Sequence, residues 1–519
     1  MLAAFENWFA KSGDFGARQL TVLRMLGLFD RPADTGCIAA LRKPPVISGL
    51  TEPLFTARID AGIGQATVQP LVDEDWNTAI SFLGDFGLVA IEFAADDSEH
   101  FLDCHPLVRE HFAKQIRDKK SDAWRSGHGR LFHYLSQSAP ELPNTLSQMD
   151  LLYESMSHGC NAGRHLQVMT DVYWPRVCRG NEFFGTTKLG AFTSELAALA
   201  TLFDVPWTRP NSSLPPELIA FSLNRAAHEL RTIGRQNESL QPALTALDIR
   251  KSQQRWKDAC TNAGIVNEVY LGLGNLREAT KFAQQTVEFA DLSGDWEHQA
   301  DQRTTLADVL HQTGAYEASE RWFRAGEAIQ QHQQPQIPFL YFVPGYQFCD
   351  LLLTMGRFRE VENRATRTLQ IAEANERLLA IALDNLSLGR ALMLRLRGKA
   401  MYDNNDRALG SQASKRFDTA VTGLRKSGEL NYLSIGLLAR ADFWVWRADR
   451  AGAMADLDEA WQNAERGSMK LQMADVLLQQ ARLLRDLKNL AAAREIILNC
   501  GYGRRVEMLV QTETEAESW

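Results

Sequence analysis

Apolar and small side chains recur in the C-terminal half of the chain at fixed distances from a repeated glycine. Gly234, Gly274, Gly314 and Gly356 follow one another at intervals of 40, 40 and 42 residues. The residue four positions before each glycine is large and apolar, the residue five positions after it is small or β-branched, and the residue nine positions after it is apolar. The segment from Ala448 and the segment from Lys488, again 40 residues apart, continue the pattern without glycine. This periodicity predicts a structural repeat.

The repeating unit is interpreted as a pair of helices. Glycine adopts the left-handed conformation that ends a helix, and a second helix begins within a few residues. The small side chain at plus five lets the two helices approach closely, and the flanking apolar side chains fill the space between them. One pair cannot bury its apolar face alone, so neighbouring pairs must stack. The expected result is a mainly α-helical, right-handed superhelix with a concave inner surface.

The four glycine turns and the small residues that follow them resemble the tetratricopeptide family, in which a glycine-acidic-aromatic turn precedes a small residue. The resemblance covers roughly residues 225–500. The period near 40 exceeds the ~34 residues usual for that family, so we expect longer helices or loops here. Repeats of HEAT or armadillo type are the competing structural interpretation.

The 92 residues between Gly356 and Ala448 leave room for one further pair of helices. Residues 387–396 and 415–424 have the pattern expected for its helices. The stretch GKAMYDNNDRALGSQ from Gly398 is interpreted as an inserted loop, because Asn404, Asn405 and Asp406 favour turns. The polar and acidic end of the chain from Gln511 is expected to fray.

Residues 1–120 have a different pattern. It predicts helices over 17–29, 34–41 and 75–86, then a strand over 87–93, a turn at Asp96-Asp97 and a returning strand over 100–103. The segment between the second and third helices is expected to be a loop. Pro106 opens a last helix at the position where proline is tolerated. Three helices, a β-hairpin and a helix form the order of a winged-helix domain.

Three segments of this region carry a wider resemblance: LRMLGLFDRPAD from Leu23, DFGLVAI from Asp85 and LDCHPLVREHF from Leu102. They resemble the winged helix of STAND signalling ATPases, a class that includes NB-ARC proteins and large bacterial relatives. The segments from Asp150 and Phe183 are similar to the helical linker of bacterial members. The resemblance implies four parts: a winged-helix domain at 1–120, a helical linker at 121–225, a tetratricopeptide-like superhelix at 226–500 and an acidic tail at 501–519.

In STAND proteins a Met-His-Asp motif at the end of the wing contacts nucleotide. The matching positions are Cys104, His105 and Pro106, so the histidine is kept and the aspartate is not. The resemblance makes His105 the candidate nucleotide-sensing residue, and capping of the following helix is the simpler interpretation. The sequence contains no GxxxxGK[ST] motif. An ATPase of this family would therefore lie on another chain or in a missing N-terminal part, with this chain a fragment, a split gene product or a degenerate paralogue.

Composition narrows the classes of function. The chain of 519 residues carries a formal net charge of −8, which argues against broad phosphate binding and makes nucleic acid an unlikely partner. The seven cysteines form no CxxC pair, no signal peptide is visible and no apolar run is long enough to cross a membrane. We expect a cytoplasmic protein that contacts no membrane.

No pattern in the sequence predicts catalysis. HExxH and GxSxG motifs are lacking. His158, Cys160 and His165 lie close together in sequence, but their spacing straddles an expected turn at Gly163, so ordinary packing is favoured over a metal site. We expect no enzyme activity, no cofactor and no metal. The candidate anchors for a ligand in the concave groove are aromatic and arginine side chains, because these dominate interfaces: Trp322, Trp444, Arg357 and Arg364.

Two functional hypotheses follow, with a third that has little support. The first is a non-catalytic sensor or scaffold module of a STAND-type signalling system, which binds a protein or peptide in the superhelix. The second is a transcription regulator whose winged helix contacts DNA and whose repeats sense a ligand. The helix expected at 75–86 would read DNA, but it contains no Lys or Arg. The third is an enzyme within 121–225, and only unassigned histidines suggest it.

Overall fold

The computed structural model describes residues 2–59, 66–93, 100–397 and 404–519. It divides into two compact units, unit 1 over Met1–Asn181 and unit 2 over Glu182–Trp519. This boundary falls inside residues 121–225, which were expected to form a single helical linker. No helix of the described residues combines the length and apolar character needed to span a bilayer.

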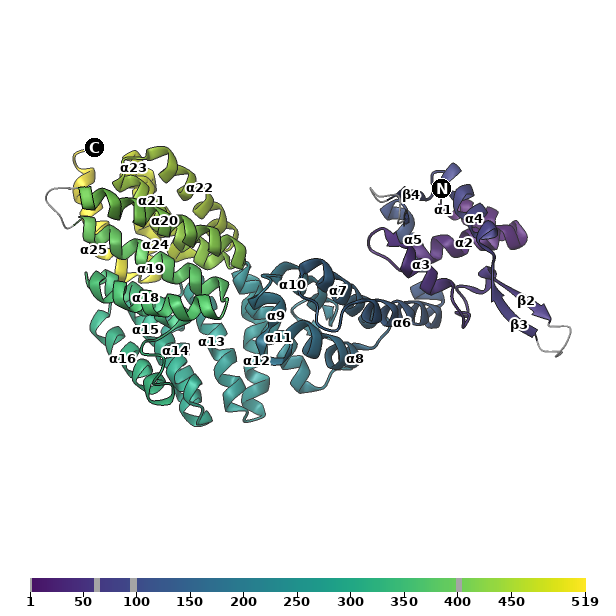
Figure 1. Cartoon of the computed structure of the whole chain (residues 1–519), viewed down its shortest axis with the longest axis horizontal. Helices are drawn as coiled ribbons and strands as arrows, with labels where there is room; N and C mark the ends of the chain where they lie inside the picture. Colours follow the sequence, from purple (N-terminus) through teal and green to yellow (C-terminus); the bar gives the residue numbers. More distant parts are fainter. Residues whose placement is uncertain (1, 60–65, 94–99, 398–403) are drawn as a thin grey trace. The chain divides into compact units, whose positions relative to one another are not determined.

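The N-terminal part of unit 1 combines helices with a small antiparallel sheet (Figure 1). β1, β5 and β4 pair in that order, with Ala33 opposite Leu102 and Ile91 opposite Leu102 on the other side. One apolar core, which includes Leu23, Leu83 and Phe112, joins α2, α4 and α5. The elements are α1 (Leu2–Lys11), α2 (Gly13–Leu26), β1 (Ala33–Asp34), α3 (Thr35–Arg42), η1 (Glu52–Leu54), β2 (Phe55–Ile59), β3 (Ala66–Pro70), α4 (Asp73–Asp85), β4 (Ala90–Phe93), β5 (His100–Asp103) and α5 (Pro106–Lys119).

The segment between α3 and α4, expected as a loop, contains an additional hairpin. β2 and β3 pair antiparallel with Phe55 opposite Pro70, and Figure 1 shows this hairpin projecting from the helices of unit 1. The expectation of a loop was wrong: residues 55–59 and 66–70 contain aromatic and β-branched side chains (Phe55, Thr56, Ile59, Thr67 and Val68) that favour strands, although neither segment alternates regularly. The turn expected at Asp96-Asp97 lies outside the described residues.

The second part of unit 1 is helical. α6 (Ser121–Ser138) packs along α7 (Leu146–Asn161), and Gly163 follows α7 with φ of 76°. After α8 (His165–Gln167), residues Val168–Cys178 form a π-helical segment, η2. Arg176 from this segment is buried and donates to the carbonyl oxygens of four residues beyond or at the end of α6, Ser136, Ala139, Pro140 and Glu141, at 2.7–3.2 Å. One guanidinium thus satisfies acceptors that a helix end leaves open.

Unit 2 begins with short elements that pack against its later helices. These are η3 (Gly180–Glu182, which starts in unit 1), α9 (Phe184–Thr187), α10 (Phe192–Ala200), β6 (Phe203–Val205) and β7 (Arg209–Pro210). Lys188 Nζ donates to the carbonyl oxygen of Asn375 at 2.8 Å. Glu195 of α10 and Glu229 of α11 contact the same buried guanidinium, that of Arg225, at 3.0 and 2.7 Å. Residues 183–200 therefore form part of the fold of unit 2.

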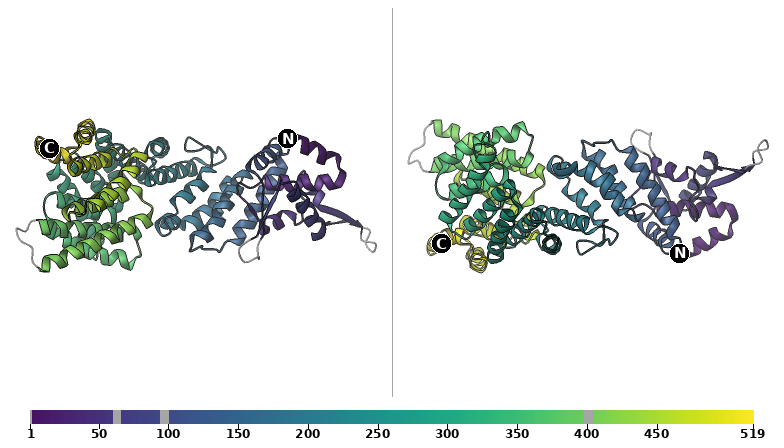
Figure 2. Two further views of the ribbon diagram at one scale, coloured as in Figure 1. Left: turned by 90° about the horizontal axis from the view of Figure 1, so that it is seen from above. Right: turned by 90° about the horizontal axis from the view of Figure 1, so that it is seen from below.

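The rest of the described part of unit 2 is a stack of seven helix pairs (Figures 1 and 2). The two helices of each pair contact one another, and the second helix of most pairs contacts the first helix of the next. Helices of about 17 residues joined by short turns explain the period of 40. The pairs are α11 (Pro216–Thr232) with α12 (Gln236–Ser252), α13 (Trp256–Gly272) with α14 (Leu276–Ser293), α15 (Trp296–Gln312) with α16 (Tyr316–Gln333), α17 (Phe342–Thr354) with α18 (Phe358–Ala374), α19 (Leu378–Arg397) with α20 (Asn404–Ser427), α21 (Leu430–Trp446) with α22 (Arg450–Arg466), and α23 (Lys470–Leu484) with α24 (Leu487–Cys500).

The four repeated glycines lie at the bends within the first four pairs. Gly234, Gly274, Gly314 and Gly356 have φ between 75° and 84°, and their amide groups donate to carbonyl oxygens of the preceding helix. The small residues that follow by five positions (Ser239, Ala279, Ser319 and Val361) are fully buried. Close approach at these points is what the pattern predicted.

The bends of the first three pairs also contact the end of the chain. A side chain added at Gly234 would meet Met469, one at Gly274 would meet Cys500 and Lys470, and one at Gly314 would meet the backbone of Gly503 at 3.1 Å. η4 (Gly503–Arg505) and α25 (Val506–Ala516) follow the last pair. The early and late hairpins of unit 2 therefore touch edge to edge.

Two expectations for the later helix pairs need correction. The sixth bend is at Arg485, with φ of 55°, three residues before Lys488, because the Asp486 side chain caps α24 by accepting from the Lys488 amide at 2.8 Å. The stretch expected as a loop from Gly398 is helical from Asn404 onward, since Asn and Asp favour helix starts as well as turns. Its first residues, 398–403, lie outside the described residues.

The acidic tail, expected to fray, is largely helical. α25 buries Leu509 and Thr512 against the last pair, in a core that also contains Leu490 and Tyr502. Leu509, Thr512 and Ala516 follow one another at intervals of three and four residues and so share the helix face that packs on the last pair, a spacing that the charge count of the tail obscured.

Candidate functional site

A cavity of about 530 Å³ lies inside unit 2. The first helix of each of the seven pairs faces it, and the C-terminal segment 502–511 forms a further wall. Its described lining includes six arginines, six carboxylates and no lysine. One polar residue from each wall helix illustrates the arrangement: Arg231, Glu268, Asp308, Asp350, Arg390, Asp442 and Asp475.

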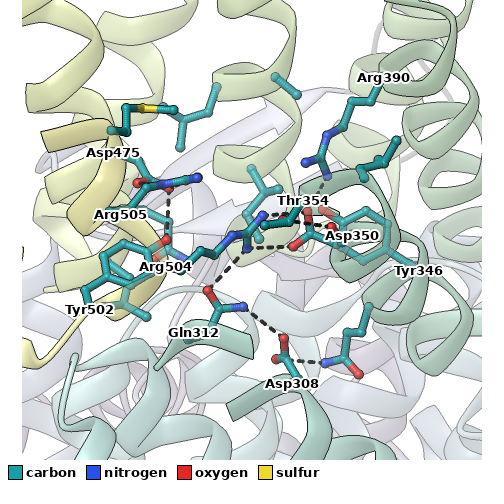
Figure 3. Close-up of a pocket in the computed structure, with 18 of the residues that line it drawn as sticks. Asp308, Gln312, Tyr346, Asp350, Thr354, Arg390, Asp475, Tyr502, Arg504 and Arg505 are labelled. Atoms are coloured by element: carbon teal, nitrogen blue, oxygen red, sulfur yellow. Dashed lines mark hydrogen bonds and ion pairs between the residues drawn. The ribbon is translucent and has the colours of Figure 1, made fainter. Parts of the chain in front are cut away.

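Asp350 on α17 is the centre of the polar network (Figure 3). Both its carboxylate oxygens accept hydrogen bonds from Arg504, each at 2.7 Å, and Arg390 approaches one of them at 2.7 Å. Burial alone would raise the pKa of the Asp350 carboxyl, but Arg504 and Arg390 lower that pKa well below its usual range. Asp350 is therefore ionised, and two guanidinium groups share its single negative charge.

The Nη1 group of Arg504 that donates to Asp350 also contacts Gln312, the first of two amide side chains around Asp308 (Figure 3). Arg504 donates to Gln312 Oε1 at 3.2 Å, Gln312 donates to Asp308 at 2.9 Å, and Gln347 donates to the other oxygen of Asp308 at 3.2 Å. Burial raises the pKa of Asp308 to about 6, and only the Gln312 hydrogen bond and the distant Arg504 oppose it. Asp308 is thus held by neutral partners, whereas Asp350 is held by charged ones.

A second arginine from the C-terminal segment pairs with the last helix pair. Arg505 donates to both oxygens of Asp475 at 2.6 and 2.9 Å, and the Tyr502 hydroxyl donates to Asp475 at 3.2 Å. Such two-point contacts between guanidinium and carboxylate fix geometry as well as charge. The segment Tyr502–Arg505 is therefore attached to α17 through Arg504 and to α23 through Arg505.

The outer part of the cavity combines apolar surface with an exposed ion pair. Arg397 contacts both oxygens of Asp442 at 2.9 and 3.1 Å. Between Arg390 and Arg397, α19 presents Met393 and Leu394 to the cavity, and α21 adds Ile435 and Leu438 from the facing wall. Apolar walls with a few fixed polar groups are typical of ligand pockets.

Several buried polar atoms of the lining have no hydrogen-bond partner among the described residues. They include the hydroxyl of Tyr346 and Oδ1 of Asn267, whose residues are 3% and 1% exposed, and the side-chain oxygens of Gln472 and Gln479. An unmade hydrogen bond of a buried group costs ~1–3 kcal/mol. These atoms are consistent with a cavity that accommodates a polar ligand.

Three of the six carboxylates that line the cavity, Asp350, Asp442 and Asp475, each pair with arginine. No group of three or more His, Cys, Asp or Glu side chains that could hold a metal was found within the described ranges. The histidines of unit 1 contact each other: His158 Nδ1 lies 2.7 Å from His128 Nδ1, and burial lowers the pKa of both.

None of the four anchors proposed from the sequence lines this cavity. Arg364 on α18 is buried, pairs with Glu327 and lies 4.3 Å from the ring centre of Phe348, so it is a core residue that no ligand reaches. Arg357 pairs with Glu320 at 2.6 Å. Arg364 lies on the second helix of a pair and Arg357 immediately before it; apart from Tyr316 at the start of α16, the lining contributed by the seven pairs comes from first helices and the residues next to them.

The two tryptophans also lie elsewhere. Trp322 on α16 packs against the cores around Phe323 and Leu306. Trp444 lines a smaller hollow of about 410 Å³. Lys415 of α20 and Arg447, which follows α21, also line it. The cavity residues could not be recognised in advance because they are scattered along the sequence. The available signal was a charge within an apolar helix, such as Asp350 in QFCDLLLT.

His105 is the N-cap of α5. Its Nδ1 accepts a hydrogen bond from the Leu107 amide at 3.2 Å, and the residue is exposed. Asp103 and Arg109 form an ion pair beside it. The structure thus gives the histidine the capping role that the sequence offered as its simpler interpretation.

Comparison with known proteins gives weak likenesses. No family model matches the chain, and no curated protein matches it. A STAND protein with a tetratricopeptide-repeat sensor from Pyrococcus horikoshii aligns at 12% identity and a TM-score of 0.40 over 95% of this chain, and this chain spans 64% of that protein. A Rap protein complexed with competence and sporulation factor aligns at 14% identity and a TM-score of 0.40, over 68% of this chain and 96% of the Rap chain. Cut9, from the APC/C tetramer Cut9–Hcn1, aligns at 12% identity and a TM-score of 0.32, over 85% and 80%.

Proposed function

We propose that the protein is a non-catalytic sensor or scaffold module that binds a peptide or a short segment of another protein in the cavity of unit 2. The observation that carries this proposal is the cavity of about 530 Å³ with unpartnered buried polar atoms in its wall. Its volume lies within the ~300–1,000 Å³ of ligand pockets. Ligand atoms that complete the hydrogen bonds of Tyr346 and Asn267 would recover the free energy that these groups lose when buried.

We further propose that residues 1–120 form a winged-helix domain of STAND type. The order of helix, strand, two helices and hairpin, together with the sheet order β1-β5-β4, supports this assignment. In a STAND system, occupation of the repeats would bias the arrangement of an ATPase domain through this domain. That ATPase domain would be a part of the same protein or a separate chain.

Contact of the winged helix with DNA is the less favoured function. α4, which would enter the groove, has Asp73, Glu74 and Asp75 in its first turn and contains no Lys or Arg. Three carboxylates at the start of the helix would repel phosphate oxygens at the very position where recognition helices approach DNA.

The experiment that tests the binding function fills the cavity. Peptides enriched from a random display library on the full-length protein are measured again on Ala439→Trp, which places an indole in the cavity from α21. Val445→Trp, at an exposed position of the same helix outside the lining, is the matched control. We expect Ala439→Trp to weaken binding at least tenfold and Val445→Trp to leave it unchanged. Equal binding to both variants, or no enrichment at all, would reject the proposal.

A further inference from the structure

Deep in the cavity of unit 2, Arg390 has no carboxylate of its own and shares Asp350 with Arg504. Arg504 occupies both oxygens of Asp350 with well-formed hydrogen bonds, and Arg390 has only an ion-pair contact to an oxygen that is already shared. Two guanidinium groups therefore face one carboxylate. Neutralising Arg390 fully requires another anion.

Arg390 is also placed to receive that anion. Its side chain is 18% exposed and lines the cavity, so its remaining N–H donors have access to the interior. A planar guanidinium with free donors binds a carboxylate at two points. Figure 3 shows Arg390 extending toward Asp350 from above, whereas Arg504 approaches from the left.

A second donor lies near Arg390. Tyr346 is one helical turn before Asp350 on α17 and lines the cavity, and its buried hydroxyl has no partner among the described residues. Burial, reinforced by Asp350, raises the pKa of Tyr346, so the hydroxyl keeps its proton and donates. An anion at this point would accept from both Arg390 and Tyr346.

We propose that the cavity selects a ligand with a single carboxylate, which docks on Arg390 and the Tyr346 hydroxyl, beside the apolar surface of Met393 and Leu394. The inference rests on the proposed function and narrows it to a peptide that carries an acidic side chain or a free C-terminus next to an apolar residue. The single guanidinium of Arg390 matches one carboxylate; a dianionic phosphate would bring a second negative charge into a buried site without a second free guanidinium beside it.

A cationic ligand group fits poorly beside the three carboxylates that pair with arginine. Asp442 and Asp475 are each held at both oxygens by an arginine, and Asp350 is held by two. A lysine or arginine of a ligand would have to displace one of these guanidiniums and leave it without a partner in the cavity.

The test uses fluorescein-labelled pentapeptide pools and the full-length protein, read by fluorescence polarisation. Each pool carries Glu, Gln, Lys or phosphoserine at one position and random residues elsewhere, and each is made with a free or an amidated C-terminus. We expect the Glu pool to bind at least tenfold more tightly than the Gln pool, or the free acids at least tenfold more tightly than the amides. The two outcomes separate the two sources of the carboxylate.

The variants locate the carboxylate. Arg390→Gln and Tyr346→Phe should each remove most of this preference. Arg395→Gln should keep it, because Arg395 lies on the same helix, is exposed and does not line the cavity. Circular dichroism of each variant checks that the helices have formed.

The remaining outcomes overturn the inference. Tighter binding of the Lys or phosphoserine pool, or an acid preference that survives Arg390→Gln, would reject the carboxylate site. If in that case Ala439→Trp still weakened the binding of the preferred pool, the proposed function would remain supported without the carboxylate site. If no pool showed binding that Ala439→Trp abolishes, both the site and the proposed function would be rejected.

Discussion

Replacing Asp350 with Asn should release the C-terminal segment from the cavity. Asn has the size of Asp and keeps one acceptor, but it leaves Arg504 and Arg390 without their shared negative charge. Removal of one partner of a buried ion pair costs ~3–5 kcal/mol. If that cost falls on the local opening of residues 502–516, the opening equilibrium rises by roughly two to three and a half orders of magnitude. Hydrogen–deuterium exchange of peptides from this segment measures the change directly.

Asp442→Asn is the matched control for this prediction. It also breaks a two-point pair with an arginine of the cavity, but the side chains of Arg397 and Asp442 are 34% and 40% exposed. A pair at such exposure contributes ~0.2–1 kcal/mol, so exchange should rise less than about fivefold. Equal protection of residues 502–516 in the two variants would refute the view that Asp350 anchors the segment.

The pH dependence of the same anchor has a definite sign. Because the pKa of Asp350 is lowered in the folded state, its contribution is complete above the unfolded-state pKa of ~3.9 and is lost as the pH falls through the folded-state pKa. Protection of the segment should therefore not change through this group between pH 5 and pH 8.

Three further predictions concern other parts of the chain. Burial raises the pKa of Asp384 to about 7, and one hydrogen bond from Thr368 opposes this, so wild-type stability should fall as the pH rises from about 4 to 7. Asp384→Asn removes the cost of burying the ionised carboxylate, ~4 kcal/mol at pH 8, and introduces the cost of burying an unpaired amide, ~2 kcal/mol. The urea midpoint of Asp384→Asn should therefore rise at pH 8 and not at pH 4. Gly314→Ala should lower the melting temperature more than Gly356→Ala, since both glycines have positive φ but only Gly314 lies against the C-terminal segment; equal losses would contradict the edge contact. Arg176→Met should lower the free energy of unfolding by at least ~3 kcal/mol, because it leaves carbonyl acceptors beyond α6 unpaired. A melting temperature within 1 °C of wild type, about the error of a thermal scan, would exclude this role of Arg176.

The helix pairs of unit 2 follow from local chemistry, and this explains why they could be predicted. A glycine with positive φ and a small residue five positions later act within one hairpin, so both signals appear in a short window of sequence. Where a non-glycine residue adopts the same conformation, as Ala448 and Arg485 do, the signal weakens. The bend at Arg485 was placed three residues too late because the buried Ala493 set the register in place of the cap.

The cavity could not be predicted, because its contacts join residues far apart in sequence. Arg504 and Asp350 are separated by 154 positions and meet only after α18 and three further helix pairs have stacked between them. The candidate anchors were chosen for residue type alone, which does not say whether a side chain lies on the first or the second helix of a pair. Arg364 shows the consequence: an arginine selected as a binding residue is one of the largest fully buried side chains in the fold.

The edge contact between early and late hairpins limits how unit 2 can evolve. An open solenoid has two free ends, gains or loses repeats by simple duplication or deletion, and needs polar caps at its ends. Here the bends at Gly234, Gly274 and Gly314 meet Met469, Cys500 and Gly503 in register. Insertion or loss of a single hairpin would shift every one of these contacts by one hairpin. We therefore expect natural variation in loop length and surface charge, but a constant number of hairpins.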